Sequence, residues 1–174
     1  MALYLIELTP VTASKDEATA LIETVSNSLS EGAELIETQV SADHKLIFAI
    51  IESENTAFAP ALNAAIGERA SVVGPDEVRL VGAELDDIKK LKKDADYLVE
   101  WDIPAEITME QYLTRKKANA PKYAEVPEVS FLRTYVREDT AKCLCFYDAP
   151  DEDAVLRARK AVSTPIDRLF KLHA

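Results

Sequence analysis

The sequence predicts an α+β protein in which one βαββαβ unit occurs twice. Short apolar strands and helices follow one another in the same order before and after a charge-rich stretch at residues 83–96. Residues 97–101, Tyr-Leu-Val-Glu-Trp, match residues 4–8, Tyr-Leu-Ile-Glu-Leu. Residues 34–49 also align without a gap with the segment that starts at Ser130, although they lack its two cysteines. We therefore expect a diverged first copy in residues 1–82 and a second copy in residues 97–174.

The elements of the first copy follow from capping, spacing and turn signals. Ser14 and Glu17 have the spacing of a capping box, in which each side chain bonds a free backbone N–H, so a helix should follow Ser14. Gly32 suits its C-terminal end. Pro60 is costly inside a helix, so the second helix, within residues 55–66, should begin late. The predicted strands are 2–8, 35–40, 46–51 and 77–81, with a loop at 72–75.

The second copy repeats this order after a linker. Residues 83–96 carry apolar residues at helical spacing among many charges, which predicts a helical linker. Thr108 and Gln111 form a second capping box, and that helix should stop near Pro121. Asp151 should cap the last helix. The predicted strands are 97–101, 129–136, 142–147 and 168–172, and the residues predicted to face inward from the last helix are Val155, Leu156, Ala158 and Val162.

A βαββαβ unit of this kind is ferredoxin-like, with a four-stranded antiparallel sheet and both helices on one face. Several strands, such as residues 46–51, are apolar on both faces, which indicates that the second face is covered as well. The simplest cover is the other copy. We therefore expect tandem ferredoxin-like repeats that pack as an intramolecular, pseudo-dimeric α+β barrel. Free edge strands would allow a homodimer of these pseudo-dimers.

Composition restricts the function classes. The chain has 174 residues, 48% of them hydrophobic, so we expect a buried core. Its net charge of −11 is spread along the sequence and repels phosphate groups, which makes nucleic acid and anionic membrane poor partners. We expect neither a secretory segment nor a membrane span. Two cysteines at i and i+2 of a strand pair poorly as a disulfide, so we expect free thiols and a cytoplasmic location.

Common catalytic and cofactor motifs are absent from the sequence. The four glycines do not form a G-x-G-x-x-G or P-loop pattern, so a nucleotide cradle has no support. The sequence also lacks G-x-S-x-G, H-E-x-x-H and C-x-x-C. Standard hydrolase, zinc-protease and zinc-knuckle functions are therefore not predicted.

The candidate metal ligands are Cys143, Cys145 and Glu100. The two cysteines point to the same face of one strand because side chains alternate with period two. Glu100 lies inside a neighbouring strand, where a carboxylate is costly unless it is paired, hydrogen-bonded or metal-bound. Thiolates favour late first-row ions such as nickel, copper(I) or zinc. The plainer alternatives are two buried core thiols and a glutamate that reaches solvent.

The remaining candidates are residues that could line a site for a small ligand. Tyr135 and Tyr147 are strand aromatics that would either line a pocket or fill the core. Glu7 is the counterpart of Glu100 in the first copy, and the match could simply reflect shared descent. His44 falls in a hairpin turn and His173 lies beside the C-terminus, so both imidazoles are expected to face solvent.

Four short segments carry a family resemblance. They are Tyr-Leu-Val-Glu at 97–100, Tyr-Val at 135–136, Cys-Phe-Tyr-Asp-Ala-Pro-Asp at 145–151, and Pro-Ile-Asp-Arg at 165–168. In combination they resemble a bacterial family of small ferredoxin-like proteins that is described as nickel-binding or as a domain of unknown function. The resemblance spans residues 97–172; the first copy is more distant and has Ala49 at the position of Cys145. It implies a ferredoxin-like fold that pairs as an α+β barrel, and nickel binding or sequestration, without assigning ligands.

Three functions stay open at this point. The first is a non-catalytic cytoplasmic protein that binds a small molecule or a transition metal, with nickel the first choice and Cys145, Glu100 and Cys143 the ligands. The second is an α+β barrel enzyme, such as a cofactor-free oxygenase or an isomerase, in which Glu100 or Tyr135 transfers protons in a pocket of the second copy. The third is a scaffold protein without a small ligand.

Overall fold

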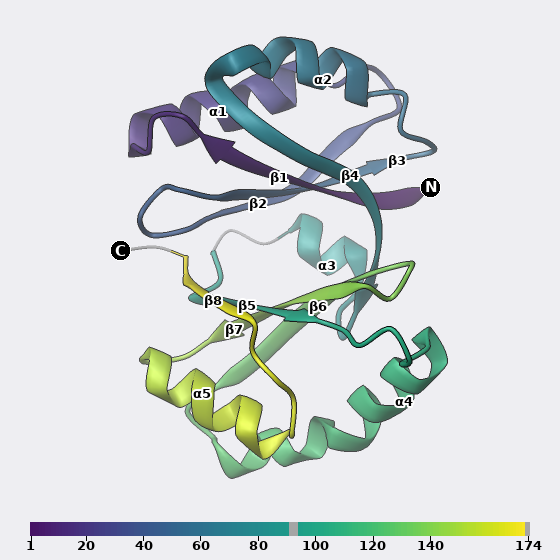
Figure 1. The fold of residues 1–174 in the computed structure, drawn as a ribbon, viewed down its shortest axis with the longest axis vertical. Helices are drawn as coiled ribbons and strands as arrows, with labels where there is room; N and C mark the ends of the chain where they lie inside the picture. The colour runs from purple at the N-terminus through teal and green to yellow at the C-terminus, as the bar shows by residue number, and fades with distance from the viewer. Residues whose placement is uncertain (91–93, 173–174) are drawn as a thin grey trace. The chain divides into compact units, whose positions relative to one another are not determined.

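The computed structural model describes residues 1–90 and 94–172, which form two compact units. Residues 1–78 and 86–90 belong to the first unit, and residues 79–85 and 94–172 to the second. Each unit has an antiparallel sheet with two main helices on one face (Figure 1), which confirms the α+β class. Within the described ranges, no helix is long and apolar enough to cross a membrane.

The first unit has the strand order β2-β3-β1-β4, with every neighbouring pair antiparallel. Its apolar core lies between this sheet and helices α1 and α2. Its elements are β1 (Ala2–Pro10), α1 (Lys15–Ser28), β2 (Glu34–Val40), β3 (Ile47–Ser53), α2 (Ala59–Ile66), the 3₁₀ turn η1 (Gly67–Arg69) and, as far as Val78, β4 (Ala70–Val81). A short helix, α3 (Leu85–Lys89), follows β4.

The predicted start of the first helix is confirmed. Ser14 is the N-cap of α1, and its Oγ accepts a hydrogen bond from the Glu17 backbone N–H at 3.1 Å. The Glu17 carboxylate accepts from Arg69 at 3.0 Å. Helix α2 begins at Ala59 and carries Pro60 in its first turn, where the missing N–H costs nothing.

The predicted loop at residues 72–75 is wrong, because β4 runs through it. Gly74 has φ +104°, and a Cβ atom there would lie 2.4 Å from the Leu5 carbonyl oxygen. The pairing of β1 with β4 shifts register between Leu5 and Glu7. A glycine-proline pair, which usually marks a turn, here accommodates an irregularity inside one strand.

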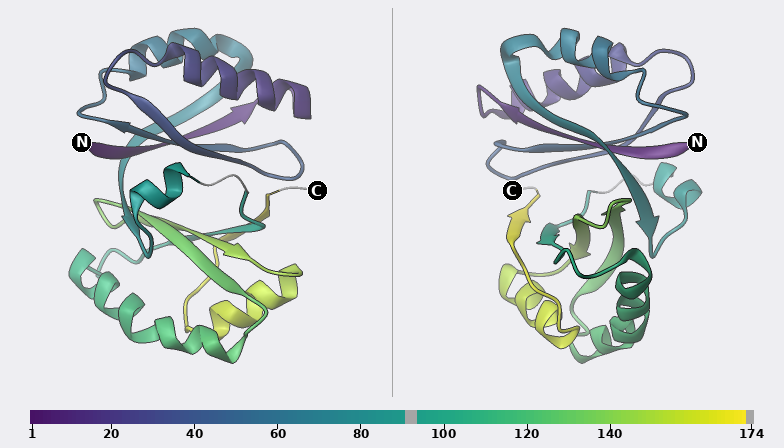
Figure 2. Two further views of the ribbon diagram at one scale, coloured as in Figure 1. Left: turned by 180° about the vertical axis from the view of Figure 1, so that it is seen from behind. Right: turned by 45° about the vertical axis from the view of Figure 1, so that its right-hand side comes forward.

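The second unit repeats the order with β6-β7-β5-β8, again antiparallel. Helices α4 and α5 lie on the same face of this sheet (Figure 2). Its elements are β5 (Tyr97–Asp102), α4 (Met109–Asn119), the 3₁₀ segment η2 (Ala120–Glu125), β6 (Ser130–Arg137), β7 (Lys142–Asp148), α5 (Glu152–Ala161) and β8 (Arg168–Lys171). The two units share element order and strand order; gene duplication and barrel packing remain predictions.

Two further predictions are corrected by the structure. Of the predicted helical linker at residues 83–96, the structure describes residues 83–90 and 94–96, and among these only Leu85–Lys89 are α-helical. Residues 91–93 lie outside the described residues. On α5, Leu156 is 44% exposed rather than inward, whereas Arg159 is only 2% exposed. The domain boundaries at residues 82 and 97 stay a prediction.

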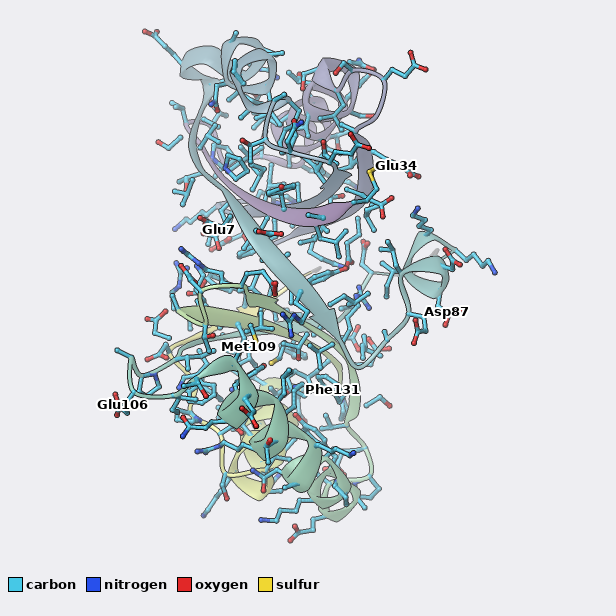
Figure 3. All side chains as sticks on the ribbon, turned by 90° about the vertical axis from the view of Figure 1, so that its right-hand side faces the viewer. Glu7, Glu34, Asp87, Glu106, Met109 and Phe131 are labelled. Atoms are coloured by element: carbon cyan, nitrogen blue, oxygen red, sulfur yellow. The ribbon has the colours of Figure 1, made fainter. Side chains whose placement is uncertain are left out.

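The core of the second unit lies between the sheet and α4, η2 and α5. Thr108 caps α4 in a complete capping box with Gln111, and Asp151 caps α5 by accepting from the Ala154 N–H at 2.8 Å. Figure 3 shows side chains filling this space, with Met109 and Phe131 labelled; both pack against the cluster. These caps and this core hold α4 and α5 against the strand that carries both cysteines.

Candidate functional site

Cys143 and Cys145 lie side by side on β7, on the face covered by α4 and α5. Each is 1% exposed, both thiols are free, and their Sγ atoms are 4.0 Å apart. Strand pairing places Trp101 and Val99 of β5 opposite them. From β6, the Thr134 hydroxyl donates to Cys145 Sγ at 3.2 Å. The predicted common orientation of the two thiols is therefore correct.

Arg159 of α5 reaches the same place. Its Nη1 donates to Cys145 Sγ at 3.5 Å and to the Tyr147 hydroxyl at 3.1 Å, and its Nη2 donates to the Pro165 carbonyl at 2.6 Å. Its Nε is buried and makes no hydrogen bond within the described residues. No carboxylate in that part of the chain lies within ion-pair distance of this guanidinium. A buried charge without a paired carboxylate is rare, because desolvation costs several kcal/mol.

The surroundings favour the thiolate at Cys145. A hydrogen bond from Cys143 and the nearby charges of Lys116 and Arg159 hold the pKa of Cys145 well below its ordinary value, although burial opposes them. The same hydrogen bond, together with burial, raises the pKa of Cys143. The pair therefore carries its first negative charge on Cys145, with the Cys143 S–H as donor.

Two tyrosines continue this polar network. The hydroxyls of Tyr123 in η2 and Tyr147 in β7 are 2.6 Å apart. Burial raises the pKa of Tyr123 to about 12 and also raises that of Tyr147. Both are therefore neutral near pH 7, and Tyr147 accepts from Arg159 while sharing a hydrogen bond with Tyr123.

Tyr112 of α4 brings a third hydroxyl close to the thiols. The residue is 3% exposed, and its buried hydroxyl makes no hydrogen bond of ordinary length and angle within the described residues, although it lies close enough to Cys143 for the two groups to interact. Burial, followed by the charges of Cys145 and Cys143, raises the pKa of Tyr112. A neutral, unsatisfied donor in this position is suited to an added acceptor.

A cavity of about 50 Å³ adjoins these groups. Its walls include both thiols and the rings of Trp101, Tyr112, Tyr123 and Phe131. The charged side chains that line it are Arg115, Lys116 and Arg159, and none of the described lining residues is acidic. In a protein of net charge −11, this is a locally positive interior site.

Arg115 and Lys116 are both held over aromatic rings. Arg115 Cζ lies 5.6 Å from the Trp101 ring centre, and Lys116 Nζ lies 4.2 Å from that of Phe131. Arg115 also donates to the Ser163 carbonyl. Within the described residues neither has a carboxylate partner, so their charge remains available to a ligand.

Glu100 lies on the opposite face of the sheet from the thiols. It pairs across the sheet with Leu144, and its carboxylate binds Lys142 at 2.7 Å and also Arg168. Burial alone would raise the pKa of Glu100, but hydrogen bonds from Arg168 and Lys142 outweigh it and lower the pKa. The expectation that Glu100 and Cys145 share one site is therefore wrong, because an odd strand offset places them on opposite faces.

The other predicted ligand-binding residues do not come together. Tyr135 lies on the face of Glu100, edge-to-face with Phe146 at 5.9 Å between ring centres. Glu7 lies in β1 of the first unit, opposite Phe48 and Val73. Tyr147 alone of these three joins the network around Cys145.

His44 does not add to the site. His44 lies between β2 and β3 with φ +62° and is half-buried. His173 lies outside the described residues.

Arg159 is a residue of the site that the sequence patterns did not predict. The available signal was position: Arg159 follows Val155 by four residues and precedes Val162 by three, so it falls on the apolar stripe of α5. A charged residue inside such a stripe indicates a buried polar contact. Tyr112, Tyr123 and Thr134 gave no comparable signal, because an aromatic or threonine on an inward face usually belongs to the core.

Comparison with known proteins agrees with the resemblance in the second unit. The family model "nickel responsive protein SCO4226-like" matches residues 97–172, which include β5 to β8 and every residue of the thiol network. No curated protein gives a significant match to the sequence.

Two solved structures show the same fold class. A putative chlorite dismutase is 15% identical with a TM-score of 0.57, and the match covers 100% of this chain and 96% of that one. An anthrone oxidase-like protein is 14% identical with a TM-score of 0.51, covering 98% of this chain and 89% of the other. At these identities the likeness shows the fold alone, which is similar to that of ferredoxin-like dimeric α+β barrel proteins.

The residues around the cavity do not fit nickel(II). No group of three or more His, Cys, Asp or Glu side chains in the described ranges is placed to hold a metal ion. With metal–sulfur bonds of about 2.3 Å, square-planar coordination needs sulfurs about 3.3 Å apart at adjacent positions or about 4.6 Å at opposite ones. The observed separation is 4.0 Å. Two thiols are also too few donors for this geometry, which needs four ligands.

Proposed function

We propose that the second unit binds a small carboxylate in the cavity between its sheet and helices α4, η2 and α5. The observation that carries this proposal is the lining: three basic side chains, Arg115, Lys116 and Arg159, and no acidic one among the described residues. A negative ligand would offset three charges that have no carboxylate partner among residues 1–90 and 94–172.

The charges leave room for such an anion even when Cys145 is ionised. A thiolate at Cys145 balances Arg159, and the other two cations remain. An anion in a partly desolvated cavity gains more from each cation than it would in water, since the effective dielectric constant is lower. The buried Tyr112 hydroxyl supplies a neutral donor for a carboxylate oxygen.

The walls and volume select a small ligand with an apolar part. A cavity of about 50 Å³ has room for about four water molecules, since each needs roughly 10–15 Å³. Trp101, Tyr123 and Phe131 offer aromatic surface to a short carbon chain. A ligand of this size would bind in about the millimolar range.

The test is to titrate the reduced protein with acetate, propionate, butyrate and benzoate and to monitor binding by the change in NMR chemical shifts. Propionamide is the neutral probe of similar shape. We expect saturable shifts at Trp101 and Tyr112 with at least one carboxylate and none with propionamide. Equal responses to propionate and propionamide, or no response to any of the four acids, would overturn the proposal.

A matched pair of variants on α5 completes the test. Arg159→Met removes the buried charge, whereas Arg157→Met removes an exposed charge that pairs with Glu128 and Asp153. Lys116→Gln, at a partly exposed position, serves if Arg159→Met does not fold. Carboxylate binding should weaken in Arg159→Met or Lys116→Gln and stay unchanged in Arg157→Met.

Binding is favoured over catalysis because the predicted proton-transfer groups are not at the cavity. Glu100 is ionised and doubly paired on the other face, which does not suit a general acid. Tyr135 lies on that face too.

We also propose that the two units arose by duplication and pack together as one barrel. The shared element and strand orders support duplication and a pseudo-dimeric α+β barrel. For a docked, compact monomer we expect a radius of gyration of about 16 Å in solution scattering. Light scattering would detect a homodimer of pseudo-dimers, and a clearly larger radius in a monomer would contradict docking.

Free thiols support a reducing compartment, so we also propose a cytoplasmic location. Cell fractionation checks this directly, and recovery of the protein outside the cytoplasm would contradict it.

A further inference from the structure

We propose that Cys143 and Cys145 together bind one monovalent thiophilic ion of the copper(I) class, and not nickel. The ion would lie between the two sulfurs, on the side of β7 that faces the cavity. This site does not depend on the proposed carboxylate, because it uses the thiols themselves as ligands.

The sulfur spacing is the first argument. For two sulfurs 4.0 Å apart and metal–sulfur bonds of about 2.3 Å, the S–metal–S angle is about 120°. This is the angle of trigonal coordination, and a small outward movement of the side chains would open it toward the linear arrangement. Soft thiolate ligands select copper(I) among the first-row ions.

Charge balance is the second argument. Two thiolates and one monovalent cation carry a net charge of −1, which the guanidinium of Arg159, 3.5 Å from Cys145 Sγ, offsets. A divalent ion would neutralise both thiolates and leave Arg159, which is 2% exposed, without a negative partner. Because uncompensated buried charge is costly, the site favours charge +1 over charge +2.

The surrounding groups are the third argument. Thr134 donates a hydrogen bond to Cys145, and Tyr112, which is 3% exposed and whose hydroxyl makes no ordinary hydrogen bond in the described part of the chain, lines the same cavity. Such donors orient and stabilise metal-bound thiolates. In the described residues no third His, Cys, Asp or Glu joins the cysteines, so a harder ion would find too few ligands.

Binding is a simple exchange of a proton for the ion. With Cys145 already a thiolate, the S–H bond of Cys143 breaks, two metal–sulfur bonds form, and one proton leaves to solvent, with no change of oxidation state. Both thiols line the cavity, so the third coordination position faces a space that a small ligand can enter.

The test uses the full-length reduced protein under anaerobic conditions. Copper(I) is delivered as its acetonitrile complex, and a chromophoric copper(I) chelator competes for it. We expect one equivalent per chain and an ultraviolet thiolate-to-copper(I) absorption band. X-ray absorption should show two sulfur neighbours. Nickel(II) should not displace the bound copper(I).

Cys143→Ser and Cys145→Ser should each weaken copper(I) binding by more than about 100-fold. Thr134→Val and Arg159→Met keep both ligands and should weaken binding by about 10- to 100-fold. Arg157→Met is the control and should bind like the wild type. Circular dichroism of the copper-free variants identifies any that fail to fold, and Thr134→Val then replaces Arg159→Met.

Undiminished copper(I) binding in both serine variants would overturn the proposal, as would a thiol-dependent nickel(II) site that outcompetes copper(I). The carboxylate titration is run on copper-free protein with both cysteines present. If the wild-type protein binds carboxylates but not copper(I), this inference alone is overturned. If it binds copper(I) but no carboxylate, only the proposed function is overturned.

Discussion

Arg159 of α5 donates a hydrogen bond to the sulfur of Cys145 on β7, across 3.5 Å in the interior of the second unit. Both residues are at most 2% exposed. The contact joins the helix to the strand and places a guanidinium where no carboxylate in the described part of the chain pairs with it. Together with the hydrogen bond from Cys143 and the charge of Lys116, it lowers the pKa of Cys145.

Replacing Arg159 should therefore change the ionisation of Cys145. We expect Arg159→Met to raise the pKa of Cys145, because a nearby positive charge is lost while burial remains. Ultraviolet thiolate absorbance, titrated in reduced protein, measures it. Arg157→Met, two residues earlier and exposed, should leave the titration unchanged; an equal change in both variants would contradict the contact as the cause.

The lowered pKa of Cys145 also links stability to pH. The pKa is lower in the folded protein than in the unfolded chain, where it is about 8.5. The resulting stabilisation is fully present above the unfolded pKa and is lost as pH falls through the folded pKa. We expect the difference in unfolding free energy between wild type and Cys145→Ser to shrink as pH is lowered from about 8.5. A difference that grows on acidification would contradict this sign.

The buried carboxylate of Glu100 should matter for stability rather than for the cavity. Glu100→Gln removes the carboxylate that pairs with Lys142 and Arg168 and should lower the free energy of unfolding by about 2 kcal/mol, less than for a fully buried pair because Arg168 is 47% exposed. Chemical denaturation measures it, with the exposed Glu106→Gln as control. Carboxylate and copper(I) binding should be unchanged, and a loss of either would place Glu100 at the site after all.

The hydrogen bond between the hydroxyls of Tyr123 and Tyr147 should contribute about 1 kcal/mol to the free energy of unfolding. Tyr123→Phe removes that hydrogen bond, while Tyr147 still accepts from Arg159. Denaturation of Tyr123→Phe beside Tyr4→Phe, a buried tyrosine of the first unit, checks the value. Equal small losses in both variants would show that the pair adds nothing beyond the change in side chain.

Gly82 should be intolerant of a side chain because Phe131 lies against it. Its φ is +88°, and a Cβ atom would lie 2.8 Å from Phe131 Cε1, whose ring lines the cavity. Gly82→Ala should cost about 2 kcal/mol and perturb carboxylate binding. Gly32 has φ +94°, and a Cβ atom there would meet nothing within 4 Å. Gly32→Ala therefore measures the backbone contribution alone, about 1 kcal/mol. Equal losses would mean that the Phe131 contact is unimportant.

Much of the local structure could be predicted because its causes are local. Ser14, Thr108 and Asp151 cap the helices as expected, since a side-chain oxygen and a backbone N–H three residues later are brought together by the helix itself. The β4 error has the opposite origin. Whether Gly74 turns the chain or continues a strand depends on β1, whose Leu5 carbonyl lies against it.

The part of the candidate site that depends on one strand could be predicted, and the part that depends on contacts between elements could not. The sequence alone determined that Cys143 and Cys145 face the same way and remain free thiols, because period-two alternation and the poor geometry of an i,i+2 disulfide are properties of one strand. Only the tertiary structure decided which groups meet them. Strand register sent Glu100 to the other face, and the packing of α5 brought Arg159 to Cys145. Register and helix packing depend on contacts between residues far apart in the chain, which no local pattern specifies.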